Sequence, residues 1–205
     1  MAQSTENKVI GRIRGTPKGW AFSPRDFLDF GERRTIDSAL HRLVQQGKIR
    51  RVIRGIYDCP RSSKFLKRPL SPDIDQVARA LARKFRWRIQ PSGATALNIL
   101  GLSTQVPARV VYRSDGPDRR YKVGNTSLVF EHTALKEAGF KMRESGLIVQ
   151  ALRSFGQERV TPEVITKIRS WLPPSLRSKL LADTRTATGR VYAAIQRIAE
   201  GEQRG

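Results

Sequence analysis

The most regular pattern of apolar and polar positions lies in residues 32–46. Apolar side chains recur there at intervals of three and four residues, at Ile36, Ala39, Leu40, Leu43 and Val44. This spacing places them on one face of an amphipathic helix. Gly47 follows at the position where helices commonly end. The pattern therefore predicts a helix from Glu32 to Gln46 with one buried face.

Two further helices are predicted upstream of this one. The first begins at Thr5, carries its apolar residues on one face and stops at residues 15–19, which are rich in Gly and Pro. Residues 20–22 form a short apolar run that favours a strand. In Ser23-Pro24-Arg25-Asp26, a capping serine precedes a proline and an acid, which predicts a helix ending at Gly31. Its short link to the next helix is typical of a helix-turn-helix.

Residues 48–58 predict a β-hairpin. Two short runs, 48–52 and 54–58, combine Ile and Val with basic residues, and Arg54-Gly55 is a plausible tight turn between them. The order helix, strand, helix, helix, hairpin predicts a winged helix-turn-helix domain over residues 1–60.

Residues 61–70 are basic and bracketed by prolines, and they predict a linker that either follows a DNA backbone or is simply solvated. Residues 71–205 predict a C-terminal α+β domain. It combines a helix over 74–86, a short helix over 94–100, an antiparallel three-stranded meander over 108–114, 119–123 and 126–131, and four later helices. The expected fold class of the whole chain is α+β.

The net charge of the chain indicates the kind of ligand that it binds. It holds 39 Lys and Arg against 18 Asp and Glu, a net charge of +21. Such an excess attracts polyanions, of which nucleic acid is favoured over an anionic membrane surface. Nearly half of the excess lies in the first 70 residues, with sixteen basic and six acidic side chains.

The polar face of the 32–46 helix and the hairpin supply the candidate DNA-binding residues. Arginine can bond guanine through two hydrogen bonds, serine and glutamine can reach base edges, and hairpin cations can contact phosphates. For Arg42 or His41 alone, an ordinary solvated side chain is the better interpretation. The candidates are Arg33, Arg34, Asp37, Ser38, His41, Arg42, Gln45, Lys48, Arg50, Arg51 and Arg54. The second basic helix, around Arg79 to Arg88, is interpreted as a solvated face, with an RNA-binding module as the alternative.

No catalytic, cofactor or metal motif is expected, so the chain is not predicted to be an enzyme. Two histidines and the single Cys59 make no zinc cluster. The lone cysteine, and the lack of a signal peptide or long apolar run, favour a cytoplasmic protein that does not contact membranes. The alternative is a metal-dependent nuclease that uses Asp118 and Glu131, with Lys122 between them.

Four stretches, Lys18–Phe27, Ala39–Gly47, Arg50–Asp58 and Gly93–Pro107, resemble the AbiEi antitoxins of abortive-infection systems and their DUF6088 relatives. The resemblance covers residues 8–132. It implies a winged-helix N-terminus that binds operator repeats in double-stranded DNA and represses its own operon. It also implies a C-terminal domain that counters a toxin of nucleotidyltransferase type. By position, Arg33, Arg34, Asp37, Ser38 and His41 would face DNA, and Arg50, Arg51 and Arg54 would lie in the wing.

Overall fold

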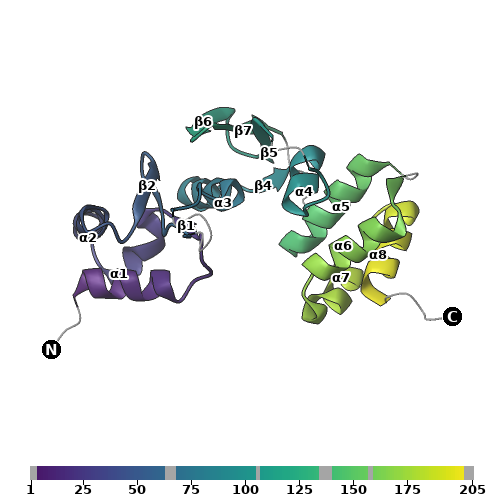
Figure 1. Ribbon diagram of the computed structural model, residues 1–205, viewed down its shortest axis with the longest axis horizontal. Coiled ribbons are helices and arrows are strands. Elements are labelled where there is room, and N and C mark those ends of the chain that lie inside the picture. Colours follow the sequence, from purple (N-terminus) through teal and green to yellow (C-terminus); the bar gives the residue numbers. More distant parts are fainter. Residues whose placement is uncertain (1–3, 63–67, 105–106, 134–139, 157–158, 201–205) are drawn as a thin grey trace. The chain divides into compact units, whose positions relative to one another are not determined.

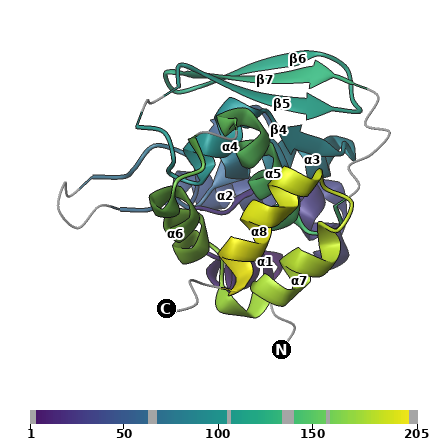
Figure 2. The same cartoon turned by 90° about the vertical axis from the view of Figure 1, so that its right-hand side faces the viewer.

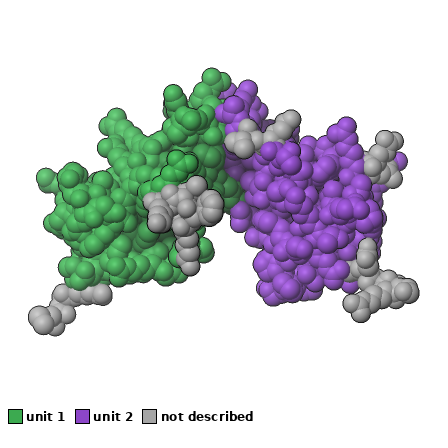
Figure 3. All heavy atoms as spheres, in the orientation of Figure 1, with its two compact units in different colours: residues 1–89, 119–129 green, residues 90–118, 130–205 purple. Residues whose placement is uncertain are grey.

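The computed structural model describes residues 4–62, 68–104, 107–133, 140–156 and 159–200, and has a mixed α+β fold with two small sheets (Figure 1). The chain forms two compact units, shown in Figure 3. Unit 1 contains Met1–Ile89 and Arg119–Val129, and unit 2 contains Gln90–Asp118 and Phe130–Gly205. Among the described helices, none combines the length and apolarity needed to cross a membrane.

The first helices of unit 1 pack around one apolar core. They are α1 (Thr5–Arg14), the 3-10 helix η1 (Pro24–Phe30) and α2 (Arg33–Gln45). The side chain of Ser4 caps α1 by accepting a hydrogen bond from the backbone of Asn7. The apolar face predicted for residues 32–46 is buried in this core. The buried residues of this core are Val9, Ile13, Phe22, Phe27, Ile36, Leu40, Leu43 and Ile49.

The segment Pro24–Phe30 is a 3-10 helix, where an ordinary helix was predicted. The predicted cap is present, because the carboxylate of Asp26 accepts a hydrogen bond of 2.8 Å from the backbone of Ser23. Residues three apart lie above one another in a 3-10 helix. The ring centroids of Phe27 and Phe30 therefore lie 6.4 Å apart. The guanidinium carbon of Arg12 lies 4.0 Å from the centroid of the Phe30 ring.

A three-stranded antiparallel sheet completes the predicted order of elements. It contains β1 (Ala21–Phe22), β2 (Arg50–Ile53) and β3 (Ile56–Asp58), in the order β1-β3-β2. The turn between β2 and β3 lies at Arg54 and Gly55, and Gly55 has a φ of 74°, which favours glycine. The strand run at residues 20–22 and the hairpin are therefore confirmed as elements.

Helix α3 (Ile74–Phe85) belongs to unit 1 and contacts β1, β3 and η1. The Arg83 guanidinium joins it to this unit through bonds of 2.7 Å to the Asp26 carboxylate and to the Ala21 carbonyl. The predicted division at residues 61–70 places this helix in the C-terminal domain, whereas the first compact unit extends to Ile89. Part of the predicted linker, residues 63–67, lies outside the described residues, and Ser62 pairs with Pro69 across it.

The second sheet contains β4 (Ile89–Pro91), β5 (Arg109–Ser114), β6 (Arg119–Val123) and β7 (Thr126–His132). Its order is β4-β5-β7-β6. The three predicted strands are present, but the predicted meander is wrong, because β7 lies between β5 and β6. The two-residue turn at Gly124 and Asn125 joins β6 and β7 as a hairpin and leaves β6 at the edge.

Unit 2 is mainly helical. It contains α4 (Gly93–Ile99), α5 (Arg143–Phe155), α6 (Pro162–Trp171), η3 (Pro174–Leu176), α7 (Arg177–Asp183) and α8 (Gly189–Glu200). Figure 2 shows α5, α7 and α8 side by side, and their facing sides form one core that includes Leu147, Ile148, Leu180 and Ile195. The Asp183 carboxylate accepts backbone hydrogen bonds of 2.8 and 2.9 Å from Lys141 and Met142, which ties the end of α7 to the start of α5.

Candidate nucleic-acid interface

The face of α2 opposite the core is polar and exposed. Burial of Ile36, Ala39, Leu40 and Leu43 turns the intervening side chains toward solvent. All seven candidates predicted on this helix are exposed: Arg33, Arg34, Asp37, Ser38, His41, Arg42 and Gln45. The sequence pattern thus located the exposed face of this helix residue by residue.

Some of these exposed side chains have partners within unit 1. The Arg33 guanidinium bonds both carboxylate oxygens of Asp37, at 2.9 and 3.0 Å. Arg42 forms an ion pair of 3.1 Å with Glu6 of α1, as expected if it is a structural surface residue. Within the described part of the chain, Arg34, Ser38 and His41 have no side-chain hydrogen bond or ion pair. These three side chains can therefore bind a ligand without breaking an existing contact.

The four hairpin candidates divide into two kinds. Lys48, Arg51 and Arg54 are exposed, as contacts to phosphate require. Arg50 instead bonds both oxygens of Asp58, at 3.0 and 2.6 Å, and donates a third bond to the carbonyl of Leu70. The Asp58 side chain is only 3% exposed, so loss of Arg50 would leave a buried carboxylate without its ion-pair partner. In the structure Arg50 therefore holds the hairpin through these contacts, and its predicted contact with phosphate stays a prediction.

Three elements of unit 1 bring cations together beside the hairpin turn. The Lys84 amine, at the end of α3, donates a hydrogen bond of 3.3 Å to the carbonyl of Arg54. Burial lowers the pKa of Lys84, and the positive charges of Arg33 and Arg54 lower it further. The Arg25 guanidinium also reaches this place, at 2.8 Å from the carbonyl of Lys84. A bound anion would relieve the repulsion among these cations.

Lys84 and Arg25 are the functional candidates that sequence reasoning missed. The basic character of residues 79–88 was the available signal. Periodicity within one helix gives no information about which distant hairpin that helix contacts. The start of α2 adds to the same cluster, because its first residue, Arg33, is one of the cations that act on Lys84. Glu32, which precedes the helix, provides no side-chain cap. The first backbone N–H groups of a helix lack partners within that helix and favour anions.

The residues of the nuclease alternative are engaged in other contacts. One carboxylate oxygen of Asp118 accepts a 2.5 Å hydrogen bond from the backbone of His132. Glu131 forms an ion pair of 2.7 Å with Arg109. Among the described residues, no three His, Cys, Asp or Glu side chains are grouped to hold a metal ion. The geometry therefore gives the nuclease alternative no support.

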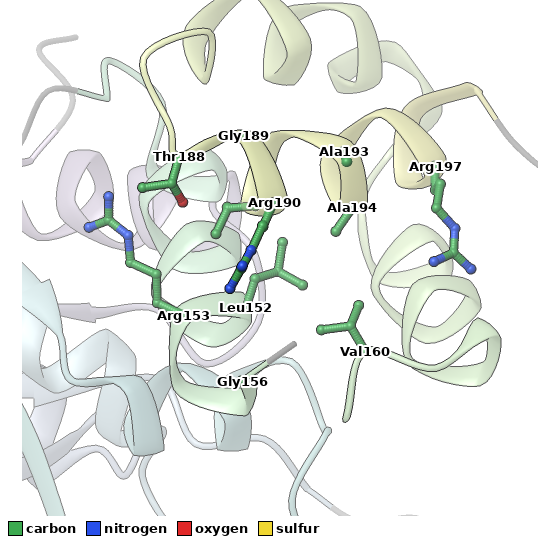
Figure 4. A pocket seen from close by; sticks show the side chains of 11 residues that line it. Leu152, Arg153, Gly156, Val160, Thr188, Gly189, Arg190, Ala193, Ala194 and Arg197 are labelled. Carbon is green, nitrogen blue, oxygen red and sulfur yellow. The ribbon is translucent and has the colours of Figure 1, made fainter. Parts of the chain in front are cut away.

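Unit 2 contains a hollow of about 670 Å³ between α5 and α8 (Figure 4). Leu152, Val160 and Ala194 contribute apolar surface to it, and Figure 4 shows Arg153 and Arg197 on opposite sides. The described residues that line it include no Asp, Glu, His or Cys. This lining can bind an apolar or anionic group, but it supplies no side chain suited to acid–base catalysis.

A comparison with models of known protein families matches most of the chain. The model of a protein family described as a family of unknown function, DUF6088, matches residues 8–179. No curated protein matches the chain. The expected relation to AbiEi antitoxins therefore stays a prediction. Because the match spans most of the sequence, the chain belongs to the DUF6088 family.

Proposed function

We propose that this chain is a sequence-specific, DNA-binding transcriptional regulator that acts by binding rather than by catalysis. Residues 5–58 form its winged helix-turn-helix, with α2 as the recognition helix and the β2–β3 hairpin as the wing. The proposal is supported above all by one observation: the exposed face of α2 and the cations around the hairpin turn belong to one compact unit and meet at Arg33, Arg54 and Lys84.

The chemistry of this surface suits duplex DNA. A helix fits the major groove, where arginine, serine and histidine can bond base edges. Arg34, Ser38 and His41 are the side chains assigned to this role, because their polar groups are unoccupied in the described structure. Arg51, Arg54 and Lys84 are assigned to phosphates, which fix position and supply salt-dependent affinity.

The test is a mobility-shift titration with the duplex upstream of the protein's own reading frame. A scrambled duplex of the same length and composition is the control. We expect the upstream duplex to bind more tightly by about a thousandfold or more. Equal affinities for the two duplexes would contradict sequence-specific regulation while leaving general DNA binding possible.

The antitoxin role extends this proposal and is supported only by the resemblance of residues 8–132 to AbiEi antitoxins. In this role the protein represses its own operon and counters a nucleotidyltransferase-type toxin. The test is co-expression with the product of the adjacent reading frame. Growth arrest by that product alone, relieved by this chain, is the expected result. A harmless neighbour, or arrest that persists on co-expression, would contradict the antitoxin role.

A further inference from the structure

The end of α3 displays an aromatic pair that the proposed duplex interface does not use. Phe85 is 43% exposed. Its ring is stacked on that of Trp87, with centroids 4.7 Å apart and planes inclined by 24°. Single exposed apolar side chains are common on protein surfaces and need no explanation. A stacked pair is different, because it presents a flat aromatic surface to a ligand.

The backbone at this place adopts a conformation that L-residues seldom take. Arg86 lies between Phe85 and Trp87 in the sequence and has a φ of 60°, the only positive value outside glycine in the described part of the chain. Its left-handed conformation lets the backbone of Trp87 bond the carbonyl of Ala82 at 2.9 Å. Helices usually use glycine at such an end. An arginine that keeps this costly conformation suggests a function for its side chain.

Cations surround the aromatic pair. The Lys84 amine lies 5.1 Å from the centre of the Phe85 ring. Trp87 also lines a hollow of about 590 Å³, together with Arg79, Ala82, Arg83, Arg86 and Ile89. Two of these arginines are already paired, since Arg79 holds Asp75 and Arg83 holds Asp26. Arg86 is exposed and has no side-chain hydrogen bond or ion pair among the described residues, so its guanidinium is available to an anion. The Lys84 amine lies beside the rings and bonds only the neutral carbonyl of Arg54, so its charge can also attract an anion.

We propose that Phe85 and Trp87 form a stacking platform for an unpaired base of a single-stranded nucleic acid, with Lys84 and Arg86 holding its phosphates. Exposed aromatic rings beside cations are the combination that single strands recognise, because every base has a flat face that can stack. Bases inside a duplex already stack on their neighbours and cannot use the platform. The site therefore shares Lys84 with the duplex interface proposed for α2, whereas its aromatic rings lie outside that interface.

The test measures binding of the full chain to labelled single strands of about ten nucleotides, a length within the usual site sizes. Three probes are compared: oligothymidylate, oligouridylate and an abasic DNA strand of equal length. The abasic strand retains the phosphates and lacks the bases. We expect Phe85→Ala to weaken binding of the base-bearing strands about tenfold and to leave abasic binding unchanged. A preference between the first two probes would tell whether DNA or RNA is the better ligand.

Leu28→Ala is the matched control, because Leu28 is 44% exposed in the same unit and belongs to no aromatic stack. It should leave all single-strand affinities unchanged. Phe85→Leu, which keeps apolar area but removes the ring, should behave like Phe85→Ala. No binding of single strands by the unmodified chain would overturn the proposal, as would an equal loss for base-bearing and abasic strands. Phe85→Ala should not change affinity for the upstream duplex, so failure here is distinguishable from failure of the regulator proposal.

Discussion

Adjacent arginines in the hairpin have different environments. Strand alternation directs Arg50 toward Asp58, its direct partner on β3, and leaves Arg51 exposed. The sequence predicted the strand and its basic character. It could not predict that one of these arginines would be paired, because Asp58 lies across a turn and the third bond goes to Leu70. Contacts of this kind depend on register and on distant backbone, which local patterns do not reveal.

Arg50→Ala should lower the free energy of unfolding by about 2 kcal/mol. Breaking a buried pair costs roughly 3–5 kcal/mol, and the partial exposure of Arg50 reduces that value. Denaturation in urea measures the change. Arg51→Ala is the control and should change stability by less than about 0.5 kcal/mol, while weakening DNA binding. These roles would be contradicted if Arg51→Ala lowered the stability more than Arg50→Ala, or if Arg50→Ala weakened DNA binding more than Arg51→Ala.

Lys84 lies near two cations in a site that also lowers its pKa by burial. A lysine whose pKa is lowered by folding disfavours the folded state while it is protonated, and that cost decreases as the pH rises from the lowered pKa toward the unfolded value. The unmodified chain should therefore gain stability at alkaline pH relative to Lys84→Met. Paired denaturation curves at neutral and alkaline pH measure this difference. The variant should also bind duplex DNA more weakly at neutral pH. If the stabilities of the unmodified chain and of Lys84→Met depend on pH in the same way, the proposed repulsion at Lys84 is contradicted.

The helices and strands themselves were largely readable from the sequence, because each depends on local signals. The apolar spacing of α2, the cap of η1 and the glycine turn of the hairpin all lie within a few residues of one another. The placement of α3 in unit 1 and the position of β7 inside its sheet were not readable. Both depend on pairing between segments far apart in the chain, such as Arg83 with Asp26.

At the level of one helix, removing the first two arginines of α2 should relax sequence preference. In Arg33→Ala/Arg34→Ala, the upstream duplex should lose affinity more than the scrambled duplex, since a side chain that bonds a base contributes about 1–3 kcal/mol of discrimination. Competition between the two duplexes measures this. Arg51→Ala/Arg54→Ala is the matched wing variant and should weaken both duplexes alike. Equal losses for both duplexes in the helix variant would argue against base reading by α2.

The junction of α5 and α7 should depend on pH. Burial tends to raise the pKa of Asp183, but hydrogen bonds from the backbones of Met142 and Lys141 outweigh it and lower the pKa. A lowered carboxyl pKa stabilises the fold above its unfolded value and loses that effect as the pH falls through the folded value. Asp183→Asn should therefore cost roughly 1 kcal/mol at neutral pH, and the cost should decrease as the pH falls below about 4 toward the lowered pKa. A constant cost across this range in urea denaturation would show that the charge is unimportant.

For the whole molecule, the excess of +21 makes affinity for polyanions expected without identifying the polyanion. Its arrangement is more informative. The exposed face of α2, the hairpin turn and the end of α3 gather cations in unit 1, and the same unit carries the aromatic pair at Phe85 and Trp87. The sequence predicted the first two surfaces. The cluster with Lys84 and the aromatic stack emerged only when the elements were placed together.

The most direct measurement of the central claim is the affinity for the upstream duplex over a series of salt concentrations, with the unmodified chain and with Arg51→Ala/Arg54→Ala. We expect log K to fall steeply with log salt, and the slope to become shallower by about one for each phosphate contact that the variant removes. The upstream duplex should remain preferred over the scrambled duplex throughout. A slope unchanged by the two substitutions, together with equal binding of both duplexes, would contradict DNA recognition by this face of unit 1.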